Sequence, residues 1–146
     1  MKNYLYSIVA CLMMACLAIS CSDEPEYDPS SHAMMDQDEY EFMVKFGKEM
    51  RLDKLASGAW DFENPLSWTG VVFEIDYQNH RRHVVKIEIW PKGMDPSVGW
   101  KDSKLPESGF ACLKRLQEFK LIRLDFRNTE LPADLFDTPV NAVFIN

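Results

Sequence analysis

The feature that most constrains this chain is a six-residue apolar pattern that occurs three times. Apolar residues occupy the first, fourth and sixth positions of residues 84–89, 121–126 and 140–145. Alternate side chains of a strand point to the same side, so the fourth and sixth residues enter a core while the fifth faces outward. Because each such strand buries its side chains only against its neighbours, we expect the three copies to stack side by side.

The second copy continues through Thr129 and Leu131 into L-x-x-L-x-L-x-x-T-x-L, which resembles the leucine-rich repeat. The segments LPESGF (105–110) and LPADLF (131–136) resemble the convex-side turns of that repeat. The first copy departs from the pattern, since Lys92 stands where a polar turn residue belongs and an insertion follows it. The step of 19 residues from Leu121 to Val140 is also just below the usual range of about 20–29.

In front of the repeats, NPLSWTGVVF resembles the N-terminal cap of extracellular leucine-rich-repeat proteins, in which a helix and a Trp-x-Gly-Val hairpin shield the first coil. The matching residues are Trp60, Trp68, Gly70 and Val71. The resemblance implies an α+β fold, with an N-terminal helix and β-hairpin cap followed by the first coils of a short leucine-rich-repeat solenoid with a small parallel sheet. The alternative is a small α+β domain with a three-stranded sheet.

We therefore divide the chain into a lipoprotein signal peptide (1–20), a disordered acidic tether (21–35), a helix-plus-hairpin cap (36–104) and a leucine-rich-repeat-like segment (105–146). A solenoid generally needs at least three coils and a polar terminal cap. Since the third copy contains only its strand, the hypothesis is a shortened form of a longer repeat protein. The open edge of its last strand would then favour self-association.

A helix is predicted from Asp36 to about Ala56. Asp36 is the expected N-cap, and Glu39 is placed to complete a capping box. Met35 and Tyr40 have the spacing of a hydrophobic staple, and Ser57-Gly58 is expected to end the element. The predicted apolar face consists of Tyr40, Met43, Val44, Phe46, Met50 and Leu55.

Two runs of alternating apolar residues after this helix predict a β-hairpin with the polar tip QNHRR (78–82). The alternating residues are Val71, Phe73, Ile75 and Tyr77 in the first strand, and Val85, Ile87 and Ile89 in the second.

The N-terminus predicts attachment to a membrane. A basic residue and an apolar run too short to span a bilayer lead to Ala-Ile-Ser-Cys (18–21), which resembles a bacterial lipobox with Cys21 as the lipidated residue. Acyl chains contribute about 0.8 kcal/mol per buried methylene, so a multiply acylated Cys21 would hold the protein on the outer membrane. The acidic run SDEPEYDPSS that follows resembles a signal for export to the cell surface, and its composition is also that of a disordered tether.

Cysteine count and charge exclude several functions. Once Cys11 and Cys16 leave with the signal and Cys21 carries lipid, Cys112 remains alone, so the mature chain has no internal disulfide and no cysteine metal site. Without Lys2, 15 basic residues (16 − 1) face 23 acidic ones. This charge of −8 argues against a nucleic-acid partner, because the phosphates would be repelled.

No catalytic, cofactor or metal constellation stands out. His80 and His83 have His-x-x-His spacing, but Arg81 and Arg82 would repel a cation, so a solvated hairpin tip is the better interpretation. The carboxylates of Asp125 and Glu130 are interpreted as part of the solvent face. We therefore expect a non-enzymatic protein with no metal and no cofactor.

The leading hypothesis is a recognition module that binds protein through the exposed face of its repeats. Stacking would place Lys86 beside Arg123 in a basic row and Glu88 beside Asp125 and Phe144 in an acidic row, with Val85, Ile122 and Asn141 in a third row. The candidate binding face is Lys86, Glu88, Arg123, Asp125, Asn141 and Phe144. The alternatives are a glycan-binding lipoprotein that uses Trp90 and Trp100, or a fragment without a ligand. Trp60 and Trp68 are assigned to the core of the cap.

Overall fold

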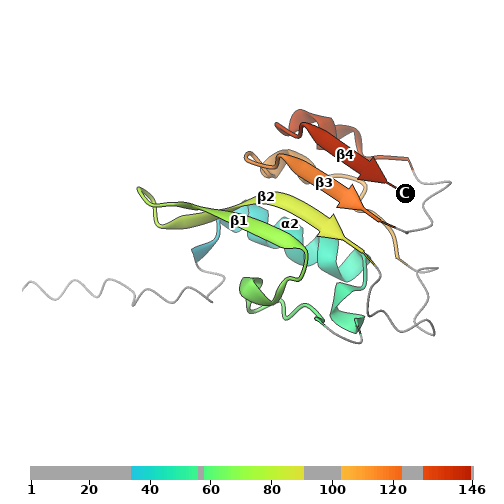
Figure 1. The fold of residues 1–146 in the computed structure, drawn as a ribbon, viewed down its shortest axis with the longest axis horizontal. Coiled ribbons are helices and arrows are strands. Elements are labelled where there is room, and N and C mark those ends of the chain that lie inside the picture. The colour runs from blue at the N-terminus through green and yellow to red at the C-terminus, as the bar shows by residue number, and fades with distance from the viewer. Residues whose placement is uncertain (1–33, 56–57, 91–102, 123–129, 146) are drawn as a thin grey trace, which may run out of the picture.

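The computed structural model describes residues 34–55, 58–90, 103–122 and 130–145, with backbone alone at 144 and 145. In this part of the chain the fold is α+β, as expected, with one α-helix, α2 (Gln37–Glu49), and one sheet. The sheet has the order β1 (Val71–Asp76), β2 (Arg81–Ile89), β3 (Glu118–Leu121) and β4 (Ala142–Ile145). β1 is antiparallel to β2, whereas β2, β3 and β4 are parallel. Figure 1 shows α2 lying along one face of the sheet, behind β1 and β2.

Four short 3-10 helices complete the described structure: η2 (Leu52–Lys54), η3 (Pro65–Ser67), η6 (Phe110–Cys112) and η7 (Ala133–Asp137). η6 contacts both α2 and η7. No helix among the described residues combines the length and the apolar character that a membrane span requires. The signal peptide, Cys21 and most of the predicted tether lie outside the described residues.

Helix α2 begins where the sequence predicted. Asp36 is its N-cap, and the Asp36 carboxylate accepts hydrogen bonds from the backbone N–H groups of Asp38 (3.1 Å) and Glu39 (3.3 Å). The capping-box role expected for Glu39 is wrong, because its carboxylate binds β2 instead. The backbone N–H of Asp36 donates to the carbonyl of Arg82. The start of α2 is therefore tied to β2.

The end of α2 comes earlier than expected. The helix stops at Glu49, not near Ala56, because Arg51 adopts left-handed backbone angles (φ 58°). The chain then forms η2, which buries Leu52 in the core. A left-handed residue costs about 1–2 kcal/mol, and burying a Leu side chain contributes about 1.5–3 kcal/mol, so the break is offset. Gly58, the expected terminator, lies in the loop beyond.

The predicted hairpin is present, and it contains a bulge that the sequence pattern did not indicate. Val72 pairs with Lys86 and Phe73 pairs with Val84, which leaves Val85 as an extra residue on β2. Val84 and Ile87 are therefore both buried, whereas Val85 is only half-buried. The expected alternation of Val85 with Ile87 is wrong.

The bulge is what produces the L-x-x-L spacing in β2.

Tyr77 also departs from the prediction, because β1 ends at Asp76 and the Tyr77 side chain is exposed.

The second parallel strand lies five residues earlier than predicted. β3 is Glu118–Leu121, and the buried apolar residues of this copy are Leu116, Phe119 and Leu121, so the pattern is met by residues 116–121. Residues 116–121 and residues 121–126 both fit the spacing, and both include Leu121. Leu121 pairs with Ile89, the sixth residue of the first copy, so Leu121 is the sixth residue of the second copy and not its first. Leu124, which was expected to align with Ile87, lies outside the described residues.

With this register, apolar residues of three strands align across the sheet. Ile87, Phe119 and Val143 are successive partners, and so are Ile89, Leu121 and Ile145. Leu116 and Val140, which begin the second and third copies, stand 24 residues apart.

The core lies between α2 and this ladder and is rich in aromatic rings. Phe119 is fully buried, and its ring centroid lies 6.3 Å from that of Phe46 on α2 and 5.4 Å from that of Phe110 on η6. Trp60 and Trp68 are buried and stacked 5.3 Å apart, which confirms their assignment to the core. Gly70 lies against β2 with φ 88°, and a Cβ at this position would overlap the Glu88 carbonyl oxygen.

The bulge predicts that two adjacent valines differ sharply in their effect on stability. Val84→Ala should lower the free energy of unfolding by about 2 kcal/mol, because it leaves a void in the core. Val85→Ala should lower it by less than about 1 kcal/mol, because that side chain is only half-buried. Urea unfolding followed by tryptophan fluorescence measures both values. Equal losses, or a larger loss for Val85→Ala, would contradict the register of β2.

Candidate functional site

The solvent face of the sheet carries charged side chains from β2 and β3. Lys86 pairs with Glu118 and Glu88 pairs with Lys120 across the two strands, and these four residues, called the charged face below, point away from the core. β4 continues the rows with Ala142 beside Glu118 and Phe144 beside Lys120.

This arrangement corrects the predicted rows. Glu118 and Lys120 take the places expected for Arg123 and Asp125, which lie outside the described residues. The third row is Val85, Gln117 and Asn141, since the Gln117 N–H donates to the Val85 carbonyl (2.8 Å) and the Asn141 N–H donates to the Gln117 carbonyl (2.9 Å). The predicted member Ile122 donates its N–H to Ile89 instead. Each charged row therefore contains both signs.

The charges of this face neutralise one another. Lys86 Nζ lies 2.8 Å from Glu88 Oε2 and 3.4 Å from Glu118 Oε2, and Lys120 Nζ lies 2.7 Å from Glu118 Oε2. The hydrogen bond to Glu88, followed by the one to Glu118, raises the pKa of Lys86. Hydrogen bonds from Lys120 and then Lys86 lower the pKa of Glu118. These side chains are 31–38 % exposed, so salt partly screens the pairs and they order the surface more than they stabilise the fold.

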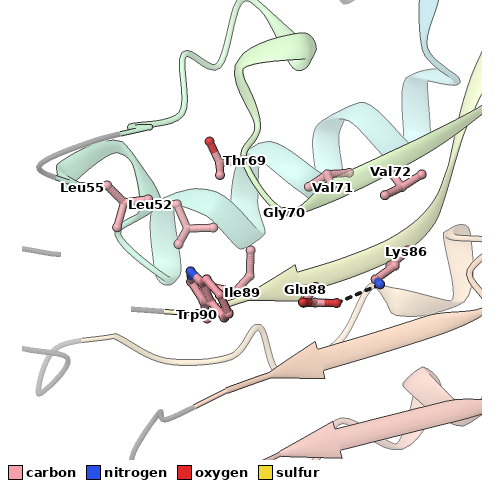
Figure 2. Close-up of a pocket in the computed structure, with 10 residues that line it drawn as sticks. All are labelled: Leu52, Leu55, Thr69, Gly70, Val71, Val72, Lys86, Glu88, Ile89 and Trp90. Carbon is pink, nitrogen blue, oxygen red and sulfur yellow. Dashed lines mark ion pairs between the residues drawn. The ribbon is translucent and has the colours of Figure 1, made fainter. Parts of the chain in front are cut away.

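A hollow of about 410 Å³ borders the charged face at the end of β2. Figure 2 shows Trp90 at the end of this strand, close to Leu52 in η2, with the Lys86–Glu88 ion pair farther along β2. Trp90 is 51 % exposed and Val72 is 49 % exposed. The hollow is lined by Leu52, Leu55, Thr69, Gly70, Val71, Val72, Lys86, Glu88, Ile89 and Trp90. A mainly apolar lining with one ion pair suits a single bulky apolar or ring-shaped group.

A second, polar hollow of about 370 Å³ lies at the start of α2. Its lining includes Glu39, which is 1 % exposed and uses both carboxylate oxygens. Oε1 lies 2.8 Å from Nδ1 of His83, and Oε2 accepts a 2.8 Å hydrogen bond from the Val84 N–H. His83 therefore does not belong to a solvated hairpin tip, as the sequence had suggested. Only His80 does, since it is exposed in the turn before β2.

Cys112 lines the same hollow as Glu39 and His83, so a cysteine, a histidine and a carboxylate are near one another. A thiol nucleophile requires the thiolate form. Burial, followed by the negative charges of Glu39 and Asp38, raises the pKa of Cys112 to about 12. The thiol is therefore protonated at neutral pH. Within the described ranges no three His, Cys, Asp or Glu side chains are arranged to hold a metal ion.

The sequence analysis missed the Glu39–His83 pair because 44 positions separate the two residues. One signal was available. Glu39 stands on the same side of α2 as Phe42, Met43 and Phe46, so its helical phase placed a carboxylate on the buried face. A charge in that position needs a partner elsewhere in the fold.

The raised pKa predicts an inert thiol. In a chain that starts at Ser22, Cys112 is the sole cysteine, and its alkylation by iodoacetamide at pH 8 should be roughly a thousandfold slower when folded than in urea. The rate should rise about tenfold per pH unit up to pH 11, because the thiolate fraction is still growing. A plateau near pH 9 in the folded protein would contradict this assignment.

No protein-family model matches the chain, and no curated protein or solved structure matches it either. The functional interpretation therefore depends on the fold and on the geometry of its surface.

Proposed function

We propose that this chain is a non-catalytic, lipid-anchored surface protein of the leucine-rich-repeat type that recognises another protein through its charged face. The observation that carries the proposal is the ladder formed by Ile87, Phe119 and Val143 on three parallel strands. Each strand belongs to one copy of the six-residue apolar pattern, which is the way in which successive repeats of this family stack.

Two further features favour a repeat architecture. The step of 24 residues from Leu116 to Val140 falls within the usual range of about 20–29, whereas the step predicted from Leu121 was too short. Trp60 and Trp68 stack on each other, Trp68 packs against Phe73 of β1, and Gly70 lies against β2. This unit is therefore adjacent to the first strand of the ladder, where an N-terminal cap would lie.

The composition of the surface favours a protein partner. The charged face has two lysines and two glutamates in mutual contact, so it is balanced while the whole chain is acidic. Beside it lies the apolar hollow with Trp90. A polar rim around an apolar centre that includes an aromatic side chain is the usual anatomy of a protein–protein interface.

A glycan is the second candidate ligand, because Trp90 is half exposed at the rim of the hollow. An indole face can stack on a sugar ring, and oligosaccharide binding would then change the tryptophan fluorescence. Trp100, the other tryptophan considered for this role, lies outside the described residues.

The proposal predicts where a partner is captured on intact cells. A photo-crosslinking side chain at Lys120, on the charged face, should give a discrete protein adduct. The same group at Lys45, which is exposed on α2, should not give that adduct. Mass spectrometry of the adducts identifies the partner. The same adduct from both positions, or polysaccharide alone at Lys120, would contradict protein recognition by this face.

A charge exchange then tests recognition without loss of the local ion pair. The quadruple variant Lys86→Glu, Glu88→Lys, Glu118→Lys, Lys120→Glu reverses every charge of the face. Opposite charges then stay next to each other both along and across β2 and β3, so the stability should stay within about 1 kcal/mol of the parent. Its affinity for the partner identified above should fall at least tenfold, since like charges would now meet across the interface. Unchanged affinity would show that the charged face is not the binding surface.

The lipid anchor is tested separately at Cys21. Cys21→Ser removes the thiol that would carry the acyl chains, so the protein should move from the outer-membrane fraction to the soluble fraction and lose fatty-acid labelling. Ser20→Ala, a change next to the modified residue, serves as the control and should leave the protein in the membrane. Retention of the Cys21→Ser protein in the membrane would exclude the anchor.

A further inference from the structure

The junction between the start of α2 and β2 depends on one buried carboxylate. β3 pairs with β2 only from Lys86 onward, so among the described residues no strand lies beside the earlier part of this edge of β2. Glu39 occupies this place, where its Oε2 accepts the Val84 N–H and its Oε1 pairs with His83 Nδ1, each at 2.8 Å. The contact of Met35 with Arg82 lies at the same junction.

Charged and titratable groups surround this carboxylate on three sides. They are Asp36 and Asp38 at the start of α2, His83 on β2, and Cys112 and Lys114 in and just after η6. The side chain of His83 is 16 % exposed, whereas that of Glu39 is 1 % exposed. Protons can therefore reach the pair through His83 and the polar hollow that both residues line.

We propose that the Glu39–His83 pair is a proton-binding latch, through which mild acidification strengthens the docking of α2 on the β1–β2 hairpin. Protonation removes the cost of a buried negative charge, and the carboxyl oxygen that accepts the Val84 N–H stays available. The latch acts on the strand that carries Lys86 and Glu88, so it would couple acidity to the rigidity of the charged face.

The direction of the effect follows from the electrostatics of the site. Loss of hydration on burial raises the pKa of Glu39 above its ordinary value of 4.5, and the hydrogen bonds from His83 and Val84 oppose this without cancelling it. The folded protein then binds more protons than the unfolded chain from pH 4.5 up to the raised pKa. The stability that protonation of Glu39 contributes is fully present below pH 4.5, and it is lost as the pH rises through the pKa of Glu39 in the folded protein.

Two other carboxyl groups with shifted pKa values affect the stability in a different pH range. Asp76 has a pKa lowered by hydrogen bonds from Asn79 and Gln78, and Glu118 has one lowered by Lys120 and Lys86. Their contributions are lost as the pH falls below the ordinary carboxyl range, so they are nearly constant above pH 4.5. The pH dependence of the latch between pH 4.5 and 7 is therefore not overlaid by Asp76 or Glu118.

The test compares unfolding by urea at pH 4.5, 5.5, 6.5 and 7.5 for the full acylated chain in detergent and for two variants. Glu39→Gln keeps an oxygen for the Val84 N–H but cannot titrate. Glu41→Gln changes an exposed residue of the same helix and is the matched control. The parent and Glu41→Gln should lose stability as the pH rises. Glu39→Gln should lose less stability, so the difference between its urea midpoint and that of the parent should increase with pH. The same pH dependence in all three proteins would overturn the proposal.

A direct titration keeps the proposal testable if Glu39→Gln does not fold. In the parent chain the side-chain carboxyl carbon of Glu39, observed by NMR with carbon-13 labelling, should titrate with a midpoint above 4.5. The Glu41 carboxyl carbon serves as the internal reference. A Glu39 midpoint at or below 4.5 would overturn the latch.

Discussion

The ring of Phe119 lies where the helix, the sheet and the 3-10 helices meet. It packs against Phe46 of α2 and Phe110 of η6, and its strand neighbours are Ile87 on β2 and Val143 on β4. Replacement of a buried Phe by Ala typically costs about 3–5 kcal/mol, a large part of the stability of a domain of this size. β3 has only four residues, so this contact, more than the strand's own length, sets its register.

The register of the core also determines the composition of the solvent face. Because side chains alternate along a strand, the alignment of Ile87 with Phe119 places Lys86 beside Glu118 and Glu88 beside Lys120 on the other side. Partly exposed ion pairs contribute little to stability, so the fold depends less on these four side chains than on Phe119. The recognition proposed for this face would therefore use side chains on which the core does not depend.

Glu39 provides the contrasting case of a charge that the fold must accommodate. A buried carboxylate without partners would be strongly unfavourable, and here it receives the Val84 N–H and the His83 ring. The same contacts complete the edge of β2 that β3 does not reach. Structural support and sensitivity to protons therefore arise from one side chain.

Local patterns in the sequence determined the elements. Asp36 marked the start of α2, and the alternating residues from Val71 to Ile75 marked β1. The apolar spacing marked β2 and β4, but it placed the strand between them five residues after its observed position. These signals depend on neighbouring residues and on a fixed periodicity, so they can be recognised without the fold.

Only the tertiary structure decided between alternatives that the local pattern left equal. Residues 116–121 and 121–126 fit the spacing equally well, and the choice came from the pairing of Leu121 with Ile89 and the packing of Phe119 against Phe46. The left-handed turn at Arg51 and the bulge at Val85 were likewise not predicted. The helical phase placed Glu39 on the buried face, but only the fold identified His83 as its partner. Each of these features depends on contacts between segments far apart in the chain, whose energies outweigh the small local preferences of helix and strand.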